Sequence, residues 1–160
     1  MAKEEKTNVM RLLDAAKISY TMHSYPHENG AVDAVSVAKL LEREPEQIFK
    51  TLVTRGASGA YYVFDIPGPA SLDLKKAAKA VGEKSIAMIA SKELLPLTGY
   101  VHGGCSPIGM KKQLPTVIDE TAELFDTIII SAGKIGCQAE LAPADLAALI
   151  GADTADVTEL

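Results

Sequence analysis

The sequence predicts an α+β fold, in which helices flank a mixed and mostly antiparallel sheet that curls or closes like a barrel. The segments with strand patterns and helix patterns do not alternate regularly, as a wound parallel sheet would require. Two neighbouring strand segments are joined by a short turn that contains glycine, which is typical of a hairpin. The chain has 160 residues, and we expect residues 1–160 to form one domain with a sizeable core.

The N-terminal part is expected to form a helix, a strand and a second helix. Thr7 is a suitable N-cap for a helix over Asn8–Ala16, because apolar residues recur there at helical spacing. Residues 18–22 alternate between apolar and polar side chains, as a half-buried strand does. A second helix is expected to begin near Asp33. The residues expected to face the core from these helices are Val9, Leu12, Leu13, Ala16, Val37, Leu40 and Leu41.

The middle of the chain carries the clearest start and end signals. Phe49–Thr54 and Ala60–Ile66 have the composition of two paired strands. Asp73 is a favourable N-cap and Gly82 a favourable terminator for a helix over Leu74–Val81. This segment is therefore expected to contribute a hairpin followed by one capped helix.

The C-terminal half is expected to contain shorter elements. A helical turn is expected over Ser91–Leu95. Pro143 is in a suitable position to begin a last helix, which ends at Gly151. Further extended segments are expected at residues 85–89, 100–101, 116–118, 127–131 and 138–141.

The charge balance limits the classes of partner. Lys and Arg number 16 against 21 Asp and Glu, a net charge of −5, so no overall positive field attracts nucleic acid or anionic lipid. A phosphate-bearing partner would have to meet a local basic surface. Candidates for such a surface are Lys75, Lys76, Lys79, Lys111 and Lys112, although each of them is an ordinary solvated lysine by default.

Cysteine content and hydropathy indicate a cytoplasmic protein without a membrane segment. Cys105 and Cys137 are too few for a disulfide scaffold and lack a CxxC spacing. The first residues contain no apolar signal region, and no apolar run approaches the roughly 18 residues of a membrane helix.

The glycine-rich segment at residues 103–109 is the most unusual in the chain. Gly104 and Gly109 have the spacing of a phosphate-binding loop, but Met110 stands where a nucleotide hydrolase requires lysine. Such a loop can still direct backbone N–H groups toward a carbonyl or phosphate oxygen. The alternative, a simple turn between strands, remains open from the sequence alone.

Lys50 is the candidate functional cation, because it begins a strand between apolar neighbours and its amine can face a cavity. The alternative is a solvated lysine at a sheet edge. The histidines His23, His27 and His102 have no metal-ligand spacing, so we expect no metal site. A nucleophilic pair of His102 and Cys105 is less expected than a buried, unreactive thiol.

Four segments together resemble the YbaK/EbsC family of bacterial Cys-tRNA(Pro) deacylases, and also the editing domain inserted in bacterial prolyl-tRNA synthetases. The resemblance runs from about Val9 to Val157, and its specific feature is the combination of a strand bearing Lys50 with a GxxPxG loop. The segments that carry it are residues 49–53, 72–79, 98–109 and 131–136.

The resemblance implies an active site. In such proteins the lysine matching Lys50 is required for activity, and the loop matching residues 104–109 faces the aminoacyl carbonyl. At Gln138 some relatives carry an aspartate, and residues 30–33 also depart from better-known members. The substrate-binding residues that the resemblance implies are Tyr25, Gly103, Gly104, Cys105, Ser106, Pro107, Ile108, Gly109, Ser131, Gly133 and Gln138.

The resemblance also implies a reaction and partners. The activity would be the release of cysteine from mischarged Cys-tRNA(Pro), as a hydrolase or a thiol-cyclising lyase, with the thiol of the substrate attacking its own ester. No cofactor, no metal and no DNA would take part, and prolyl-tRNA synthetase would supply the tRNA selection in a ternary complex. Two alternatives remain: a non-catalytic module that binds tRNA or synthetase, and a deacylase of another small aminoacyl-tRNA such as Ala-tRNA(Pro).

Overall fold

The structure is a computed structural model that describes residues 6–26 and 34–159. In these residues the α-helices are α1 (Asn8–Ala15), α2 (Ala34–Leu41), α3 (Leu74–Val81), α4 (Ser91–Thr98) and α5 (Pro143–Ile150), and the 3-10 helices are η1 (Pro45–Gln47) and η2 (Glu120–Leu124). The strands are β1 (Thr21–Ser24), β2 (Phe49–Gly56), β3 (Tyr61–Pro67), β4 (Ile86–Met88), β5 (Thr116–Asp119), β6 (Ile128–Lys134), β7 (Cys137–Leu141) and β8 (Asp153–Ala155).

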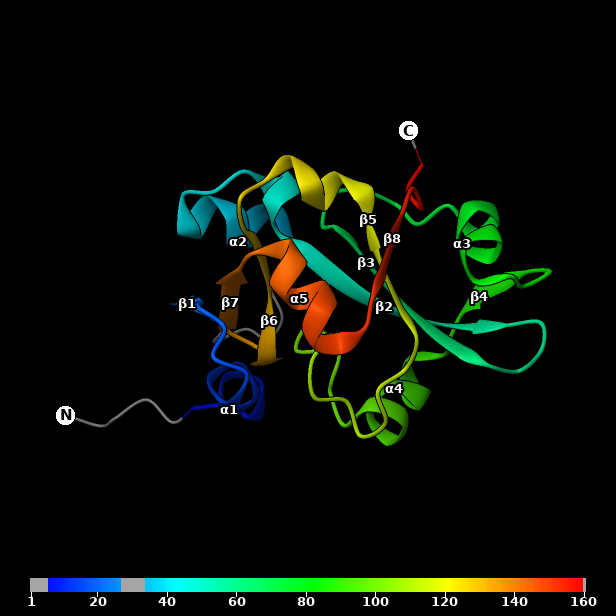
Figure 1. The fold of residues 1–160 in the computed structure, drawn as a ribbon, viewed down its shortest axis with the longest axis horizontal. Coiled ribbons are helices and arrows are strands. Elements are labelled where there is room, and N and C mark those ends of the chain that lie inside the picture. The colour runs from blue at the N-terminus through cyan, green and yellow to red at the C-terminus, as the bar shows by residue number, and fades with distance from the viewer. Residues whose placement is uncertain (1–5, 27–33, 160) are drawn as a thin grey trace.

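The strands form two sheets (Figure 1). One is antiparallel, with the order β1-β7-β6, and the other is mixed, with the order β4-β2-β3-β5-β8. A single parallel bridge between Ile48 and Ile129 joins the start of β2 to β6. The α+β class with mixed and mostly antiparallel pairing is therefore confirmed. The sheets meet along one short line instead of closing into a continuous barrel.

The local signals for the first helix and the hairpin are confirmed. The Thr7 hydroxyl accepts a hydrogen bond from the Met10 N–H and caps α1. Strands β2 and β3 form the expected antiparallel hairpin, in which Thr51 lies opposite Asp65.

The signals around α3 are also confirmed. The Asp73 carboxylate accepts hydrogen bonds from the N–H groups of Lys75 and Lys76 at the start of the helix. Gly82 ends α3 in the left-handed conformation, with φ of 74°. A glycine adopts this conformation without the steric cost that a side chain would incur.

Several expectations were wrong in detail. Leu12 and Leu40 are 37% and 52% exposed, while Met10 and Ala38 are buried in their helices. The segment at residues 100–101 is not a strand, and α4 continues to Thr98, beyond the expected turn. The expected helix start at Asp33 lies outside the described residues.

Each face of the five-stranded sheet packs against a different cover. Even-numbered residues such as Leu52 and Phe64 pack with Ala77 and Ala78 of α3. Odd-numbered residues such as Val53 and Val63 pack instead against the loop that carries Cys105, Met110 and Leu114. The alternation of side chains along a strand therefore decides which residues of β2 can approach the glycine-rich loop.

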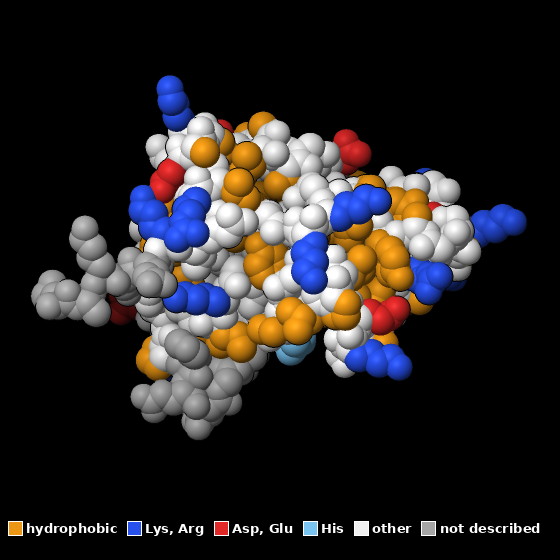
Figure 2. Space-filling view, turned by 90° about the horizontal axis from the view of Figure 1, so that it is seen from below, with side chains coloured by type: hydrophobic (Ala, Val, Ile, Leu, Met, Phe, Trp, Pro, Cys, Tyr) orange, Lys and Arg blue, Asp and Glu red, His pale blue; other side chains and the backbone are white. Residues whose placement is uncertain are grey.

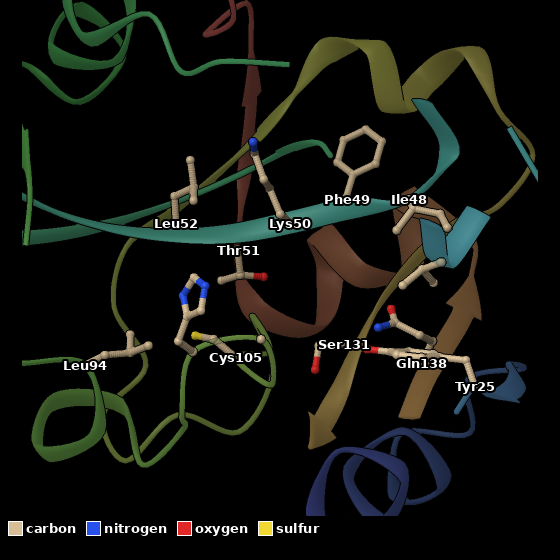
Figure 3. A pocket seen from close by; sticks show the side chains of 13 residues that line it. Tyr25, Ile48, Phe49, Lys50, Thr51, Leu52, Leu94, Cys105, Ser131 and Gln138 are labelled. Carbon is tan, nitrogen blue, oxygen red and sulfur yellow. The ribbon is translucent and has the colours of Figure 1, made fainter. Parts of the chain in front are cut away.

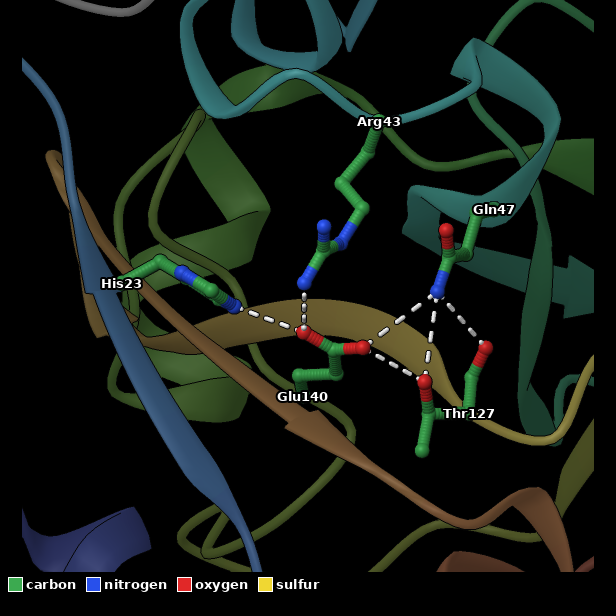
Figure 4. A network of polar contacts seen from close by, with 5 residues as sticks. All are labelled: His23, Arg43, Gln47, Thr127 and Glu140. Atoms are coloured by element: carbon green, nitrogen blue, oxygen red, sulfur yellow. Dashed lines mark hydrogen bonds and ion pairs between the residues drawn. The ribbon is translucent and has the colours of Figure 1, made fainter.

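A polar cluster anchors the segment that leads into β2 (Figure 4). One oxygen of Glu140 on β7 lies 2.7 Å from His23 Nε2 and 3.2 Å from an Arg43 nitrogen, and the other accepts from the Thr127 hydroxyl at 2.5 Å. Gln47 donates to the Thr127 carbonyl at 3.0 Å. Burial raises the pKa of Glu140, but the hydrogen bonds from Thr127, His23 and Arg43 outweigh burial and hold the pKa below its usual value. The cluster fixes residues 43–47, directly before Lys50, against the small sheet.

The described α-helices are eight residues long, and none of them is long and apolar enough to cross a membrane.

Candidate functional site

The candidate site is a cleft where the two sheets diverge. Beyond the bridge from Ile48 to Ile129, β2 pairs with β3 along its whole length but meets β4 only from Thr54 onward. Among the described strands, residues 49–52 therefore have one edge without a strand partner. Side chains from both faces of β2 reach this open edge, so consecutive residues of the strand line the same cleft.

The open edge also presents backbone groups. The Gly68 N–H donates to the Ile48 carbonyl at 2.7 Å, and the Gly56 N–H donates to the Ala60 carbonyl at 2.8 Å. These bonds show that the backbone N–H and C=O groups of the even-numbered residues of β2 point toward β3. Because antiparallel pairs alternate, the N–H and C=O of Thr51 point to the opposite edge, toward the cleft.

The cleft has a volume of about 180 Å³, below the roughly 300–1,000 Å³ that is usual for drug-sized ligands. A cleft of this size suits a small ligand. Figure 3 shows its walls, which come from β2, β6, β7, α4 and the glycine-rich loop. The lining residues are Tyr25, Val37, Ile48, Phe49, Lys50, Thr51, Leu52, Leu94, His102, Gly103, Cys105, Ser131 and Gln138.

Lys50 is the one Lys or Arg among the described residues that line the cleft. Its side chain projects from β2 on the side opposite to Thr51 (Figure 3). Burial of the amine lowers the pKa of Lys50, because the charged form loses part of its hydration. No carboxylate in the described part of the chain forms an ion pair with this amine. A partly desolvated cation of this kind can polarise a carbonyl or hold a phosphate.

Gln138 and Ser131 form the wall opposite β2 and lie directly across from each other on β7 and β6. The Gln138 Oε1 atom is buried and has no hydrogen-bond partner. A buried acceptor without a donor costs about 1–3 kcal/mol, so this atom favours a ligand that brings an N–H or O–H group. Tyr25 lies beside Gln138 in the cleft (Figure 3).

The glycine-rich loop contributes less of the lining than expected. Gly103 and Cys105 line the cleft, whereas Gly104, Ser106, Pro107, Ile108, Gly109 and Gly133 do not. Ile108 is buried in the core beside α1, and its carbonyl accepts a hydrogen bond from the Tyr100 hydroxyl at 2.5 Å. Gly109 and Gly133 have φ of 77° and 103°, so both occupy conformations that favour glycine. These residues hold the loop in place instead of facing the cleft.

Gly104 shows why the loop needs a glycine. A Cβ atom at this position would lie 3.1 Å from Ile135 N and 3.2 Å from Lys134 C, both backbone atoms of the turn between β6 and β7. Gly104→Ala is expected to push Gly103 and Cys105 out of position and to reduce the activity that the resemblance implies at least ~10-fold, since displacements near 1 Å can cost up to about 100-fold. The measurement is the single-turnover rate of the variant.

Gly151→Ala is the control for this prediction. Gly151 ends α5 with a φ of 66°, a Cβ there meets no atom within 4 Å, and the residue is not among those lining the cleft. It should lower the melting temperature without changing the rate. Equal rates for wild type and Gly104→Ala would mean that the loop does not position the cleft.

Cys105 is poorly suited to act as a nucleophile. Burial, with a smaller contribution from nearby Asp65, raises the pKa of Cys105 to about 12, so its thiol stays protonated at neutral pH. His102 lines the same cleft, but no hydrogen bond between the two side chains is found in the described residues. The arrangement does not provide a Cys–His nucleophile pair.

Sequence reasoning missed part of the cleft. Val37, Ile48 and Leu94 belong to an apolar wall that only tertiary packing assembles. Thr51 was not predicted as a cleft residue, because its place in the lining depends on the open edge of β2. Asp65 did leave a signal: it is the single acidic residue in the apolar strand Tyr61–Pro67, where a charge is rarely buried.

In residues 6–26 and 34–159 no three His, Cys, Asp or Glu side chains converge in a way that could hold a metal ion. None of the described residues that line the cleft is Asp or Glu. The chemistry available from these residues is therefore that of one amine, one imidazole, one protonated thiol, hydroxyls, an amide and backbone groups.

Comparisons with known proteins agree on one family. Residues 28–149 match the model of the aminoacyl-tRNA editing domain. EbsC of Enterococcus faecalis, which carries an inferred assignment as a Cys-tRNA(Pro)/Cys-tRNA(Cys) deacylase, is 46% identical over 155 residues, or 97% of this chain and 94% of EbsC.

Two further similarities are more distant. The proline–tRNA ligase of Kosmotoga olearia is 29% identical over 100 residues, which are 62% of this chain and 17% of the ligase. A solved structure described as a proposed trans-editing enzyme for prolyl-tRNA synthetase superposes with a TM-score of 0.81 at 28% identity, over 98% of this chain and all of the other. The chain belongs to the aminoacyl-tRNA editing domain family, and its activity is that of an aminoacyl-tRNA deacylase.

Proposed function

We propose that this chain releases cysteine from mischarged Cys-tRNA(Pro), acting in trans on the aminoacyl-tRNA. The observation that carries the proposal is the small cleft, which combines one partly desolvated lysine with an unpartnered acceptor, in a chain 46% identical to EbsC. We take residues 1–160 as one deacylase domain that works in the cytoplasm, where aminoacyl-tRNA is used.

The cleft residues have complementary roles in this proposal. Lys50 polarises the ester carbonyl or holds the terminal nucleotide, and the Thr51 N–H at the open edge donates to the developing oxyanion. Gln138 Oε1 accepts a hydrogen bond from the α-amino group of the substrate, which satisfies its missing partner. Ser131, Gly103 and Tyr25 complete the walls around the aminoacyl group.

The substrate supplies the nucleophile. Its thiolate attacks the ester carbonyl, so that a sulfur–carbon bond forms while the bond from that carbon to the ribose oxygen breaks. The ribose oxygen takes a proton, and the cyclic thioester that leaves is opened later by water. The absence of any acidic thiol in the described cleft supports this assignment, because Cys105 is held protonated. An aminoacyl ester is already activated, so positioning and oxyanion stabilisation are sufficient help from the protein.

A panel of charged tRNAs tests the function. Cys-tRNA(Pro) and Ala-tRNA(Pro) are prepared separately, and the loss of aminoacyl-tRNA is followed under single-turnover conditions. We expect release of cysteine at least ~100-fold faster than release of alanine, because alanine fits the cleft but has no thiol. Faster release of alanine would make the chain an alanyl-tRNA deacylase, and release of neither would leave a tRNA-binding module.

The surface around α1 and α4 is the proposed contact for tRNA. These helices lie at the bottom of Figure 1, and Figure 2 views that side: Lys and Arg side chains are spread across it, with fewer acidic side chains between them. Because the net charge is −5, we propose that affinity for tRNA alone is weak and that prolyl-tRNA synthetase supplies the selection in a ternary complex.

Charge reversal tests this surface. Lys111 and Lys112 are exposed and follow the glycine-rich loop, so the double variant Lys111→Glu/Lys112→Glu is expected to weaken binding of tRNA and to reduce the salt dependence by a slope of about 2. The matched control reverses the exposed residues Lys75 and Lys79 on α3, which lies away from α1 and α4. Tight, salt-independent binding of free tRNA by the wild type would contradict the proposal that prolyl-tRNA synthetase supplies the tRNA selection.

A further inference from the structure

A buried carboxylate lies directly beneath the cleft and is not used by the proposed function. Asp65 on β3 has no exposed surface, and its Oδ1 atom accepts a hydrogen bond from the Thr51 hydroxyl at 2.6 Å. Its other oxygen, Oδ2, has no hydrogen-bond partner. Thr51 itself lines the cleft, so its hydroxyl connects the cleft to a carboxylate that no ligand can reach directly.

The register of the hairpin places the Thr51 and Asp65 side chains next to each other. Thr51 and Asp65 lie opposite each other on β2 and β3. Ile48 and Gly56 form backbone hydrogen bonds with the residues opposite them, so the odd-numbered pair of Thr51 and Asp65 has no backbone hydrogen bonds between its two members. Side chains approach most closely in such pairs. In Figure 3 the Thr51 side chain points from β2 toward Cys105, on the face of the sheet that Asp65 shares.

The charges around Asp65 leave it without a cation. Lys50 projects from the opposite face of β2, and the residue paired with Asp65 on β5 is Ile118. Cys105 in the glycine-rich loop is the titratable neighbour whose pKa Asp65 influences. Burial raises the pKa of Asp65 to about 7, although the hydrogen bond from Thr51 opposes that shift. A group with this pKa can gain and lose a proton near neutral pH.

We propose that Asp65 acts through Thr51 as the acceptor of the proton that the substrate thiol loses. The proposal rests on the function proposed above. The thiol proton passes to the Thr51 oxygen while the Thr51 hydroxyl proton passes to Asp65 Oδ1. The resulting thiolate attacks the ester carbon, and the bond from that carbon to the ribose oxygen breaks. The proton then returns through Thr51 to the ribose oxygen, so no net proton is consumed in the cyclisation.

This relay supplies the cleft with a carboxylate that can accept a proton. No Asp or Glu is found among the described lining residues. Asp65 places a carboxylate behind the wall, where it cannot pair with the α-amino group of the substrate. Asp65 is thus a positioning residue for the proton, and Thr51 is the group that touches the substrate.

The test is the pH dependence of single-turnover release from Cys-tRNA(Pro), measured from pH 6 to pH 9. Asp65→Asn is expected to be ~10- to 100-fold slower than wild type near pH 7, and the gap should narrow above the thiol pKa of about 8.5, where the substrate ionises unaided. Thr51→Val should reproduce this profile, Thr51→Ser should retain most of the wild-type rate, and the double variant should be no slower than the slower single variant.

Thr54→Val is the matched control. It removes the hydroxyl of a buried threonine of β2, which donates to the Tyr62 carbonyl at 2.9 Å on the opposite face, so its pH profile should follow that of the wild type. A profile unchanged in Asp65→Asn and in Thr51→Val would overturn the relay while leaving the proposed function intact. A wild-type protein that leaves Cys-tRNA(Pro) intact at every pH would overturn both.

Discussion

Lys50→Met is expected to reduce the rate of cysteine release at least ~100-fold while leaving the protein folded. Methionine keeps most of the length and apolar contact of the lysine stem but removes its charge. Lys50 is the one Lys or Arg among the described residues of the cleft, so no neighbouring cation there can replace it. Burial lowers the pKa of Lys50, which shows that its amine is partly desolvated. Loss of one donor to a developing oxyanion costs about 2.7–4 kcal/mol. The measurement is the single-turnover rate, together with the melting temperature.

Lys79→Met is the control for Lys50→Met, because Lys79 is an exposed lysine on α3 outside the cleft. It should leave the rate within ~2-fold of the wild type, as is usual for a surface substitution. A folded Lys50→Met protein that keeps the wild-type rate would remove Lys50 from the active site.

Asp65→Asn is expected to stabilise the protein at alkaline pH. The pKa of Asp65 is about 7 in the folded state because of burial, against about 3.9 in an unfolded chain. The folded state therefore holds the proton more tightly, and stability present below pH 4 is lost as the pH rises toward 7. The difference of about three pKa units corresponds to ~4 kcal/mol. Asparagine is never ionised, and it can still accept the Thr51 hydrogen bond.

Urea unfolding at pH 4.5 and pH 8 measures this effect. The free energy of unfolding of Asp65→Asn minus that of the wild type should increase by several kcal/mol between the two pH values, in favour of the variant. Taking this difference cancels the other groups that titrate over the same range. The same difference at both pH values would show that Asp65 does not ionise in the folded protein near pH 7.

Local signals predicted the elements that depend on few residues. The caps Thr7, Asp73 and Gly82 fixed their helix ends, because a cap is satisfied by atoms within one turn. Strand β8 was missed because Asp153–Ala155 is short, largely exposed and lacks apolar alternation. The exposure of Leu12 and Leu40 could not be read from helical spacing, since it depends on where α1 and α2 dock.

The cleft was only partly predictable for the same reason. Six residues that the pattern and the resemblance predicted line it: Tyr25, Lys50, Gly103, Cys105, Ser131 and Gln138. The resemblance also pointed to the whole glycine-rich loop, but most of that loop packs against α1 and the turn between β6 and β7. The roles of Thr51 and Asp65 depend on the hairpin register and on the divergence of β2 from β6, which are tertiary features.

The central claim is that the thiol of the substrate, held in this cleft, breaks its own ester bond. The most direct measurement compares single-turnover release from Cys-tRNA(Pro) and Ser-tRNA(Pro) by the wild type and by Cys105→Ala, with Cys137→Ala as a core thiol control. The account predicts that cysteine leaves at least ~100-fold faster than serine, whose hydroxyl is far less acidic than a thiol of pKa about 8.5, and that Cys105→Ala retains substantial activity. Equal rates for the two substrates, together with loss of activity in Cys105→Ala alone, would contradict it and indicate a covalent cysteine enzyme.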